Sequence, residues 1–273
     1  METSIQELLN HPAVQSGLIP FVVAILVAEL LQRMRLSGLA IVAGFAATVY
    51  FVSDFSFSPL TSTRKIILLG LVSTVLALPF FNLRGMRLVL AMAGAAAAVW
   101  AMQGVLQRQE LQNMLLWGAG CALYVGWLIY WFDGLQHAPV RAASAGMALG
   151  FGTGIATLMG ASALLGQLGL AVGSAASAYL VIMSLTNHHL PAGRSFTLPL
   201  SLLAGLLGCA GVLLAKLPWY CLPVLALIPL ISLVPVSEKL ALWLQSTLLS
   251  VATLSGAAVA VYLSWRINDA PPF

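Results

Sequence analysis

Long apolar stretches without a charged side chain follow one another along almost the whole chain. They occupy residues 8–28, 36–53, 66–83, 88–107, 111–132, 142–193, 195–215, 217–237 and 240–265. A helix needs about 20 apolar residues to cross a bilayer, so most of these stretches are long enough to span one. Only 7% of the residues are charged, against about 25% in an ordinary soluble domain. We therefore expect an all-α integral membrane protein with several spans.

The number of spans follows from the lengths of these stretches. Residues 142–193 form one run of 52 residues, enough for two spans joined by a turn near Gly160–Gln167. Nine stretches, one of them doubled, predict about ten helices, five in residues 1–135 and five in residues 136–273. The second and third stretches are short, which leaves eight or nine spans as alternatives. The connections are brief, so any activity belongs within the membrane or to a partner protein.

Basic side chains between the spans predict the orientation, because cytoplasmic loops carry an excess of Lys and Arg. With the N-terminus outside, the inner side receives Arg33, Arg35, Arg84, Arg87, Arg141, Arg194 and Lys239. The outer side receives Arg64, Lys65, Arg108, Lys216 and Arg266. This small excess predicts that both termini lie outside. Tryptophans near the expected span ends are typical of an interfacial belt: Trp117, Trp131, Trp219, Trp243 and Trp265.

The N-terminus carries Glu2 and Glu7 instead of a basic region, so we expect the first span to be retained and not cleaved as a signal peptide. Short loops and the lack of an organelle targeting signal favour the inner membrane of a bacterium. The protein's immediate partner is then the lipid bilayer. A membrane-protein partner or a second copy of the chain stays open. The chain has no arginine-rich arm, so nucleic acid is not expected as a partner.

The two halves of the sequence resemble each other. Residues 118–129 read GAGCALYVGWLI and residues 256–267 read GAAVAVYLSWRI, which aligns Tyr124 with Tyr262 and Trp127 with Trp265. Residues 44–52 match 173–181 in the same order, and two dipeptides, Ser56-Phe57 and Leu78-Pro79, recur as Ser195-Phe196 and Leu217-Pro218. Chance matches are the alternative, because Gly, Ala, Leu and Val are common in this chain.

A true duplication would have a topological consequence. Five spans per half is an odd number, so the second half would enter the membrane from the opposite side, as in the inverted repeats of many transporters. Such a five-plus-five plan is similar in architecture to the drug/metabolite transporter superfamily. The chain carries no motif of that superfamily, and the basic residues predict the other orientation. The likeness therefore concerns the fold and does not give a function.

Few polar side chains lie near the expected middle of the membrane. Our candidates for binding a substrate are Thr153, Thr157, Ser174, Ser177 and Glu29. The hydroxyl groups have a structural alternative, since Ser and Thr often bond to a carbonyl of their own helix. Glu29 is the one acid that we place inside a span, where ionisable groups are usually functional. It also has a structural alternative, an ion pair with Arg33 four residues later.

Small residues and prolines predict how some helices pack. Glycines spaced by four residues lie on one helix face and allow close helix contacts; those expected to serve helix packing are Gly146, Gly150, Gly154, Gly169 and Gly173. They predict tight packing of spans six and seven, with a dimer interface as the alternative. Pro223, Pro229 and Pro235 predict that span nine is kinked or broken. Broken helices line the cavities of some transporters.

No cofactor, metal or catalytic site is predicted. The three cysteines (Cys121, Cys209 and Cys221) lie in apolar stretches without a CxxC motif, as buried core residues do. His188 and His189 are adjacent near one span end, while His137 and Asp133 lie in another loop. A metal site needs three or four converging ligands, and adjacent helical residues point about 100° apart. No recognised catalytic motif occurs, so an enzyme is not expected.

Three functions remain to be compared. We favour a small permease or flippase that moves a neutral organic or lipid-like solute by alternating access. The alternative is a non-catalytic subunit or assembly factor of a larger membrane complex. An intramembrane enzyme acting on lipid is the third, and its best available residues would be Glu29 and His188.

Overall fold

A computed structural model describes residues 7, 11–34, 36–53, 58–77, 85–237 and 239–267. Every regular element among them is helical, which confirms the predicted all-α class. The elements are η1 (Val14–Leu18), α2 (Ile19–Leu31), η2 (Gln32–Met34), η3 (Ser37–Leu39), α3 (Ala40–Val52), α4 (Ser62–Leu76), α5 (Met86–Leu106), α6 (Leu111–Gly134), α7 (Pro139–Met159), α8 (Ala163–Thr186), α9 (Gly193–Leu214), α10 (Cys221–Ala226), α11 (Ile228–Ile231) and α12 (Leu242–Ile267).

Seven helices in the described part of the chain are long and apolar enough to cross a membrane. They are Val14–Met34, Met86–Leu106, Leu111–Gly134, Pro139–Met159, Ala163–Thr186, Gly193–Leu214 and Leu242–Arg266. The chain is therefore a multi-pass helical membrane protein. Three of the ten predicted spans form shorter segments, 37–52, 62–76 and 221–231. The long stretch 142–193 forms α7 and α8, and α7 ends directly before Gly160 at the start of the predicted turn.

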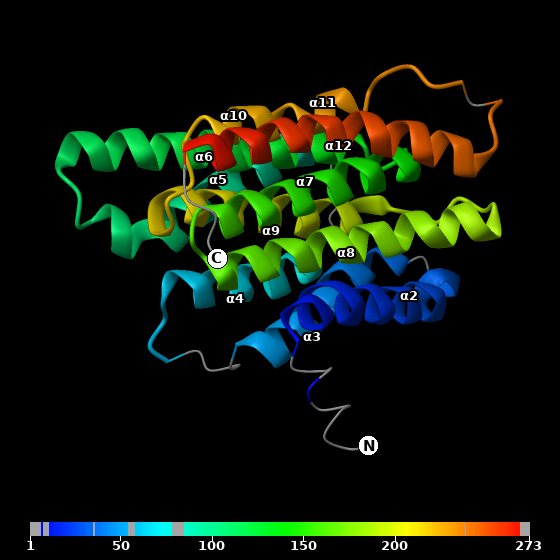
Figure 1. Cartoon of the computed structure of the whole chain (residues 1–273), viewed down its shortest axis with the longest axis horizontal. Coiled ribbons are helices and arrows are strands. Elements are labelled where there is room, and N and C mark those ends of the chain that lie inside the picture. Colours follow the sequence, from blue (N-terminus) through cyan, green and yellow to red (C-terminus); the bar gives the residue numbers. More distant parts are fainter. Residues whose placement is uncertain are drawn as a thin grey trace.

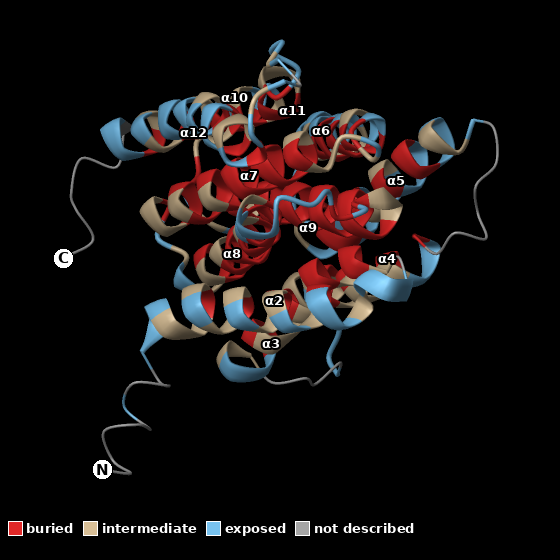
Figure 2. Cartoon of the chain, turned by 90° about the vertical axis from the view of Figure 1, so that its right-hand side faces the viewer, coloured by how far each residue is buried: buried red, intermediate tan, exposed pale blue. Residues whose placement is uncertain are grey.

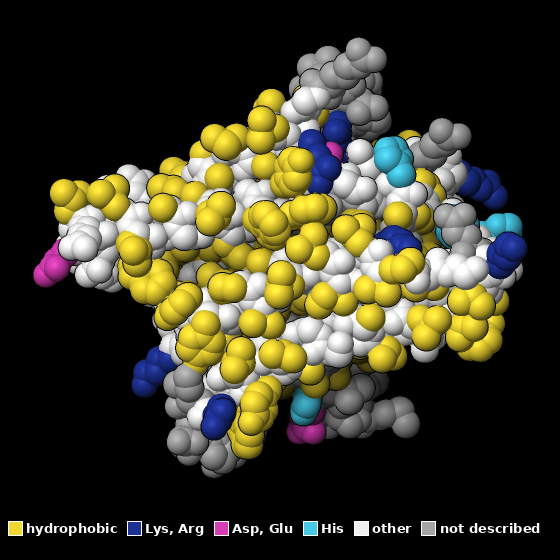
Figure 3. Space-filling view, turned by 90° about the horizontal axis from the view of Figure 1, so that it is seen from above, with side chains coloured by type: hydrophobic (Ala, Val, Ile, Leu, Met, Phe, Trp, Pro, Cys, Tyr) yellow, Lys and Arg dark blue, Asp and Glu magenta, His cyan; other side chains and the backbone are white. Residues whose placement is uncertain are grey.

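The helices α7, α8 and α9 form the centre of the bundle, and the others surround them (Figures 1 and 2). In each central helix, between 72% and 83% of the most apolar 18-residue stretch is buried. In the other long helices this buried share is 22% to 39%. α2 and α3 lie against α8, α4 and α6 lie against α9, and α12 lies along α7. The outer helices expose Leu, Val, Met and Trp side chains, and few charged side chains interrupt the apolar face in Figure 3. Such a surface is suited to contact with lipid tails, because they are as apolar as these side chains.

Glycine brings the central helices together. A Cβ atom at Gly154 of α7 would lie 2.6 Å from the backbone nitrogen of Leu170 in α8, and one at Gly169 would lie 2.6 Å from Cα of Gly154. Gly150 and Gly173 face each other in the same contact. These four glycines therefore lie where α7 and α8 meet. Gly146 instead faces Leu200 of α9.

Contacts along α7 define two ends of the bundle. Gly146 faces Leu200 and Gly211 faces Thr157, so α7 and α9 run parallel and finish at the same end. The side chain of Thr253 donates to the carbonyl of Ser144, and that of Ser264 donates to the carbonyl of Ala156, so α12 is also parallel to α7. We call the end where α7 and α9 begin the Arg194 end. The end where they finish is the Lys216 end.

The segment between α9 and α12 runs the length of the bundle. It leaves the Lys216 end, where the backbone nitrogen of Lys216 donates to the carbonyl of Gly160 at 2.8 Å. It reaches the Arg194 end, where the guanidinium of Arg141 donates to the carbonyls of Ser232 and Val234. The helix is broken on the way, because α10 ends at Ala226 and α11 begins at Ile228. Proline explains the break, since it removes a backbone donor and disfavours a straight helix.

Several basic side chains lie at the two ends of the bundle. Of those predicted for the inner side, Arg87, Arg141 and Arg194 lie in the first two turns of α5, α7 and α9, at the Arg194 end. Lys216 and Arg266 lie at the Lys216 end, on the other side. Arg35 and Arg84 lie outside the described residues. Which end faces the cytoplasm stays a prediction.

Candidate functional site

The predicted substrate-binding hydroxyl groups are mostly bonded within their own helices. Thr157 donates to the carbonyls of Thr153 (2.8 Å) and Gly154 (2.9 Å), and Ser177 donates to the carbonyl of Ser174 (2.7 Å). Ser174 donates to the carbonyl of Ser16 in η1, at a longer 3.4 Å. These are the structural bonds that Ser and Thr commonly make in helices.

The structure does not bring the five predicted site residues together. Thr157 lies at the contact of α7 with α9, whereas Ser174 lies on the side of α8 that faces η1. Glu29 is exposed near the end of α2 and accepts a bond from the side-chain amide of Gln32 at 2.9 Å. The predicted pairing of Glu29 with Arg33 is not among the ion pairs of the described residues. Glu29 is therefore an exposed side chain near a helix end.

Thr153 has a different environment, which the sequence did not reveal. Its hydroxyl is buried close to the hydroxyl of Tyr124 from α6, and neither oxygen has hydrogen-bonding geometry with the other or with any other polar atom of the described residues. Gly208 of α9 makes room for the tyrosine, since a Cβ atom there would lie 3.1 Å from Cε1 of Tyr124. Buried hydroxyl groups without partners are uncommon. In the sequence, this position was indicated only by the alignment of Tyr124 with Tyr262 in the two similar segments.

A groove of about 470 Å³ opens beside Tyr124, between α6, α9 and α10. Its lining is apolar and aromatic and includes Trp117, Tyr124, Trp127, Trp219, Leu222 and Pro223. This volume falls in the range of about 300–1,000 Å³ that is typical of small-molecule sites. The lining offers polar groups mainly through its tryptophans, because the hydroxyl of Tyr124 is buried. The groove therefore suits an apolar ligand with at most a few polar atoms.

Trp127 joins the groove to the broken helix. Its indole nitrogen donates to the carbonyl of Ala226, the last residue of α10, at 3.0 Å. Carbonyl groups at a helix end lack donors within the helix, so this bond satisfies one of them. The break in the crossing segment thus lies in the wall of the groove, and Trp127 holds it against α6.

The cysteines and histidines form no metal centre in the described part of the chain. Cys121 lies in the groove wall, and the thiol of Cys209 is 3.8 Å from its carbonyl oxygen. Cys221 donates to the carbonyl of Ala260 in α12 at 3.4 Å, and all three cysteines are buried and free. His137, His188 and His189 are exposed at the Arg194 end.

Polar contacts join several helices at the Arg194 end. Asp133 at the end of α6 forms an ion pair with Arg194 at the start of α9, with 2.7 Å between Oδ1 and Nε. The hydroxyl of Tyr179 donates to the carbonyl of Pro191 at 2.6 Å and lies 2.9 Å from the hydroxyl of Ser37. The prediction that Asp133 lies in a loop is therefore wrong, because Asp133 belongs to α6 and has a structural partner.

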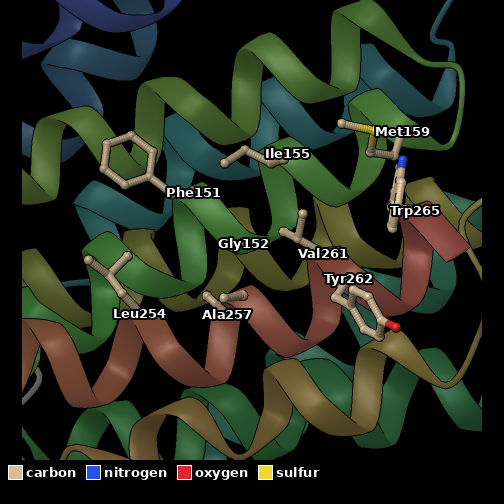
Figure 4. Close-up of a pocket in the computed structure, with 10 residues that line it drawn as sticks. Phe151, Gly152, Ile155, Met159, Leu254, Ala257, Val261, Tyr262 and Trp265 are labelled. Carbon is tan, nitrogen blue, oxygen red and sulfur yellow. The ribbon is translucent and has the colours of Figure 1, made fainter. Parts of the chain in front are cut away.

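A second apolar groove of about 460 Å³ lies between α7 and α12 (Figure 4). Phe151, Ile155 and Met159 come from α7, while Leu254, Val261 and Trp265 come from α12. Figure 4 shows Met159 and Trp265 close together at one end of the groove and Phe151 at the other. This groove lies along the two parallel helices and away from Tyr124.

No protein-family model, curated protein or solved structure matches this chain.

Proposed function

We propose that this protein is a permease or flippase for a lipid-like solute that enters the groove between α6, α9 and α10 from the bilayer. One observation carries the proposal: an aromatic groove lies directly against a discontinuous segment that runs from one end of the bundle to the other. Discontinuous helices form substrate sites in many transporters. Asp, Glu, Lys, Arg and His are absent from the described groove lining, which favours a neutral or lipid-like solute.

The proposal includes ten membrane crossings. The segment 217–237 starts at the Lys216 end and finishes at the Arg194 end, although neither of its helices is long enough to span a membrane alone. α3 starts at the Arg194 end, where Gly38 lies against Ser195 and Phe196. α4 starts near the other end, where the ammonium of Lys65 donates to the carbonyl of Trp100 at 2.9 Å. Irregular or short segments are tolerated at membrane depth where protein covers them.

Support for the inverted repeat is mixed. A two-fold axis in the membrane plane would place equivalent helices together, and α3 does contact α8 while α4 contacts α9. α12 and α7 share a long parallel contact. In the first half, α6 and α2 would be the equivalent pair, but α6 packs mainly on α5 and α9. Two of the repeated dipeptides, Ser56-Phe57 and Leu78-Pro79, lie outside the described residues. Alternating access by rocking residues 1–135 against 136–273 rests on this repeat and stays part of the proposal.

Transport of a fluorescent phospholipid tests the proposed function. Purified protein is reconstituted into vesicles with a nitrobenzoxadiazole-labelled phospholipid, and dithionite is added to quench the label in the outer leaflet. A flippase brings the inner label to the surface, so the fluorescence falls well below the level reached in protein-free vesicles. Equal quenching in vesicles with and without protein would contradict the proposal.

A matched pair of variants places the transport in the groove. Gly120 lines the groove and Gly104 lies on α5 outside it, and a Cβ atom at either position meets no atom within 4 Å. Gly120→Phe fills the groove and is expected to slow translocation by about tenfold, which is about 1.4 kcal/mol of barrier. Gly104→Phe is expected to keep the wild-type rate. Equal rates in the two variants would place the route elsewhere.

A non-catalytic membrane subunit is the second candidate. It is favoured by the dense centre, where glycines of α7 and α8 touch and the hydroxyl groups of Thr157 and Ser177 are bonded within their helices. A subunit of this kind would be recovered from mild detergent with a stoichiometric partner and would not move the labelled lipid. A monodisperse protein that moves the lipid alone would rule it out.

A further inference from the structure

We propose that the groove between α7 and α12 holds one acyl chain of an anionic phospholipid, whose phosphate lies at the Lys216 end beside Arg266 and Lys216. This site is separate from the proposed transport route, which lies between α6, α9 and α10.

The length of the groove fits one leaflet of a bilayer. Its lining extends along α12 from Leu254 to Trp265, about 16 Å at 1.5 Å per residue. The hydrocarbon core of a bilayer is about 30 Å thick, so one leaflet is about half of that. Met159 marks the outer end of the groove, because the next residue, Gly160, is bonded to Lys216 at the Lys216 end. A chain lying in the groove would therefore run from the interface to the middle of the membrane.

The chemistry of the lining fits an acyl chain. The lining residues are apolar apart from the tyrosine hydroxyl and the indole nitrogen, and both of those residues lie toward the outer end. Tyr262 and Trp265 are about half exposed, as aromatic residues at a membrane interface usually are. The outer end of the groove therefore suits the glycerol and ester region of a lipid, and the rest of the groove suits the methylene groups of its acyl chain.

The charge at the outer end selects an anionic headgroup. Arg266 directly follows Trp265, and the backbone of Lys216 lies against the end of α7. Both side chains are exposed, and the ion pair of the described residues, Asp133 with Arg194, involves neither of them. Arginine binds phosphate with paired hydrogen bonds. An arginine and a lysine at the end of the bundle where the groove finishes complement a lipid phosphate joined to an acyl chain.

A third groove offers an internal control. It lies between α5 and α6 and has a volume of about 380 Å³, but Gln103 and Gln107 are in its lining. Glu110 follows Arg108 closely in the loop at its outer end. Two side-chain amides lie in its lining and its outer end carries both signs of charge, so it should bind an anionic lipid less well.

The experiment is a titration of the detergent-purified protein with phosphatidylglycerol, followed by thermal unfolding and by native mass spectrometry. We expect a saturable rise in the midpoint of unfolding and one retained phosphatidylglycerol per chain. Phosphatidylcholine with the same acyl chains and inorganic phosphate alone should each raise the midpoint much less. An equal rise with phosphatidylcholine would overturn the headgroup assignment, and an equal rise with inorganic phosphate would overturn the groove.

Variants separate the two parts of the site. Arg266→Gln with Lys216→Gln removes the charges and leaves the groove intact, and we expect the half-saturating phosphatidylglycerol concentration to rise by about tenfold. Ala258→Phe fills the groove from an exposed position and should have a similar effect. Ala119→Phe makes the same change in the α5–α6 groove and should bind as the wild type does. Unchanged binding in Ala258→Phe, or equal losses in both phenylalanine variants, would overturn the site.

Discussion

Two buried tyrosines in this bundle differ in whether their hydroxyl groups have partners. Tyr179 bonds to the carbonyl of Pro191 and lies beside the hydroxyl of Ser37, so it ties α8 to the segment before α9. Tyr124 is buried close to Thr153, and neither hydroxyl group forms a hydrogen bond with the described residues. A bonded hydroxyl adds to stability, whereas an unpaired one costs stability when it is buried.

Replacing each tyrosine by phenylalanine tests this difference. Tyr179→Phe is expected to lower the free energy of unfolding by about 1 kcal/mol, the usual net value of a buried hydrogen bond. Tyr124→Phe should leave stability unchanged or slightly higher, because it removes an unpaired polar group. Denaturant unfolding in detergent measures both. A large loss of stability in Tyr124→Phe would show that its hydroxyl is bonded in the folded protein.

The sequence predicted part of this chemistry and missed the rest. Bonding of Thr157 and Ser177 to their own helices was an open alternative, because it depends only on residues three or four positions away. The approach of Tyr124 to Thr153 depends on how α6 packs against α7 and α9, through Gly208. Such a contact joins residues that are far apart in the chain, so spacing alone does not reveal it.

At the scale of helices, the glycines of α7 and α8 set how closely the central pair can pack. A Cβ atom at Gly154 would lie 2.6 Å from the backbone of Leu170, which cannot move without shifting α8. Gly154→Ala is therefore expected to destabilise the protein by about 1–3 kcal/mol, the usual cost of overpacking. Gly104→Ala in α5, where the added Cβ meets no atom within 4 Å, should be neutral or stabilising by up to about 1 kcal/mol. Denaturant unfolding of the two variants compares them, and equal stability would contradict close α7–α8 packing.

The broken segment is held in place by a side chain from another helix. Trp127→Phe removes the donor to the carbonyl of Ala226, a loss of about 1 kcal/mol that should raise local opening of residues 221–231 about fivefold. Trp219→Phe is the control, since this exposed tryptophan lines the same groove from the loop before α10. Hydrogen exchange of the backbone amides measures both variants. Unchanged exchange in Trp127→Phe would show that the bond does not hold the segment.

Prolines in the sequence predicted the break in this segment but not the residue that holds it. Pro223 and Pro229 act locally through the missing backbone donor, so they can be read from the chain alone. The choice of Trp127 as the donor depends on the position of α6. For the segments 37–52 and 62–76, the sequence did not show how short the helices are. Their apolar stretches looked like short spans, yet their helices are too short to cross a membrane straight.

At the scale of the whole molecule, low charge and long apolar stretches predicted a multi-pass helical protein, and seven long apolar helices confirm that class. Apolar stretches predict where helices form, but they contain no information about which helices become central. The central position of α7, α8 and α9 follows from their small residues, which allow close contacts on several faces. The inverted repeat stays a prediction, because similar sequences in the two halves do not fix equal packing.

The proposed transport route requires that residues 217–237 cross the membrane from the Lys216 end to the Arg194 end. The direct test labels Lys216→Cys and Lys239→Cys, each in a chain whose three buried cysteines are replaced by alanine, with a membrane-impermeant maleimide in sealed vesicles. Arg108→Cys and Arg141→Cys mark the two ends independently. We predict that positions 216 and 108 react from one side and that positions 239 and 141 react from the other. Labelling of positions 216 and 239 from the same side would contradict the crossing, and with it the proposed transport route.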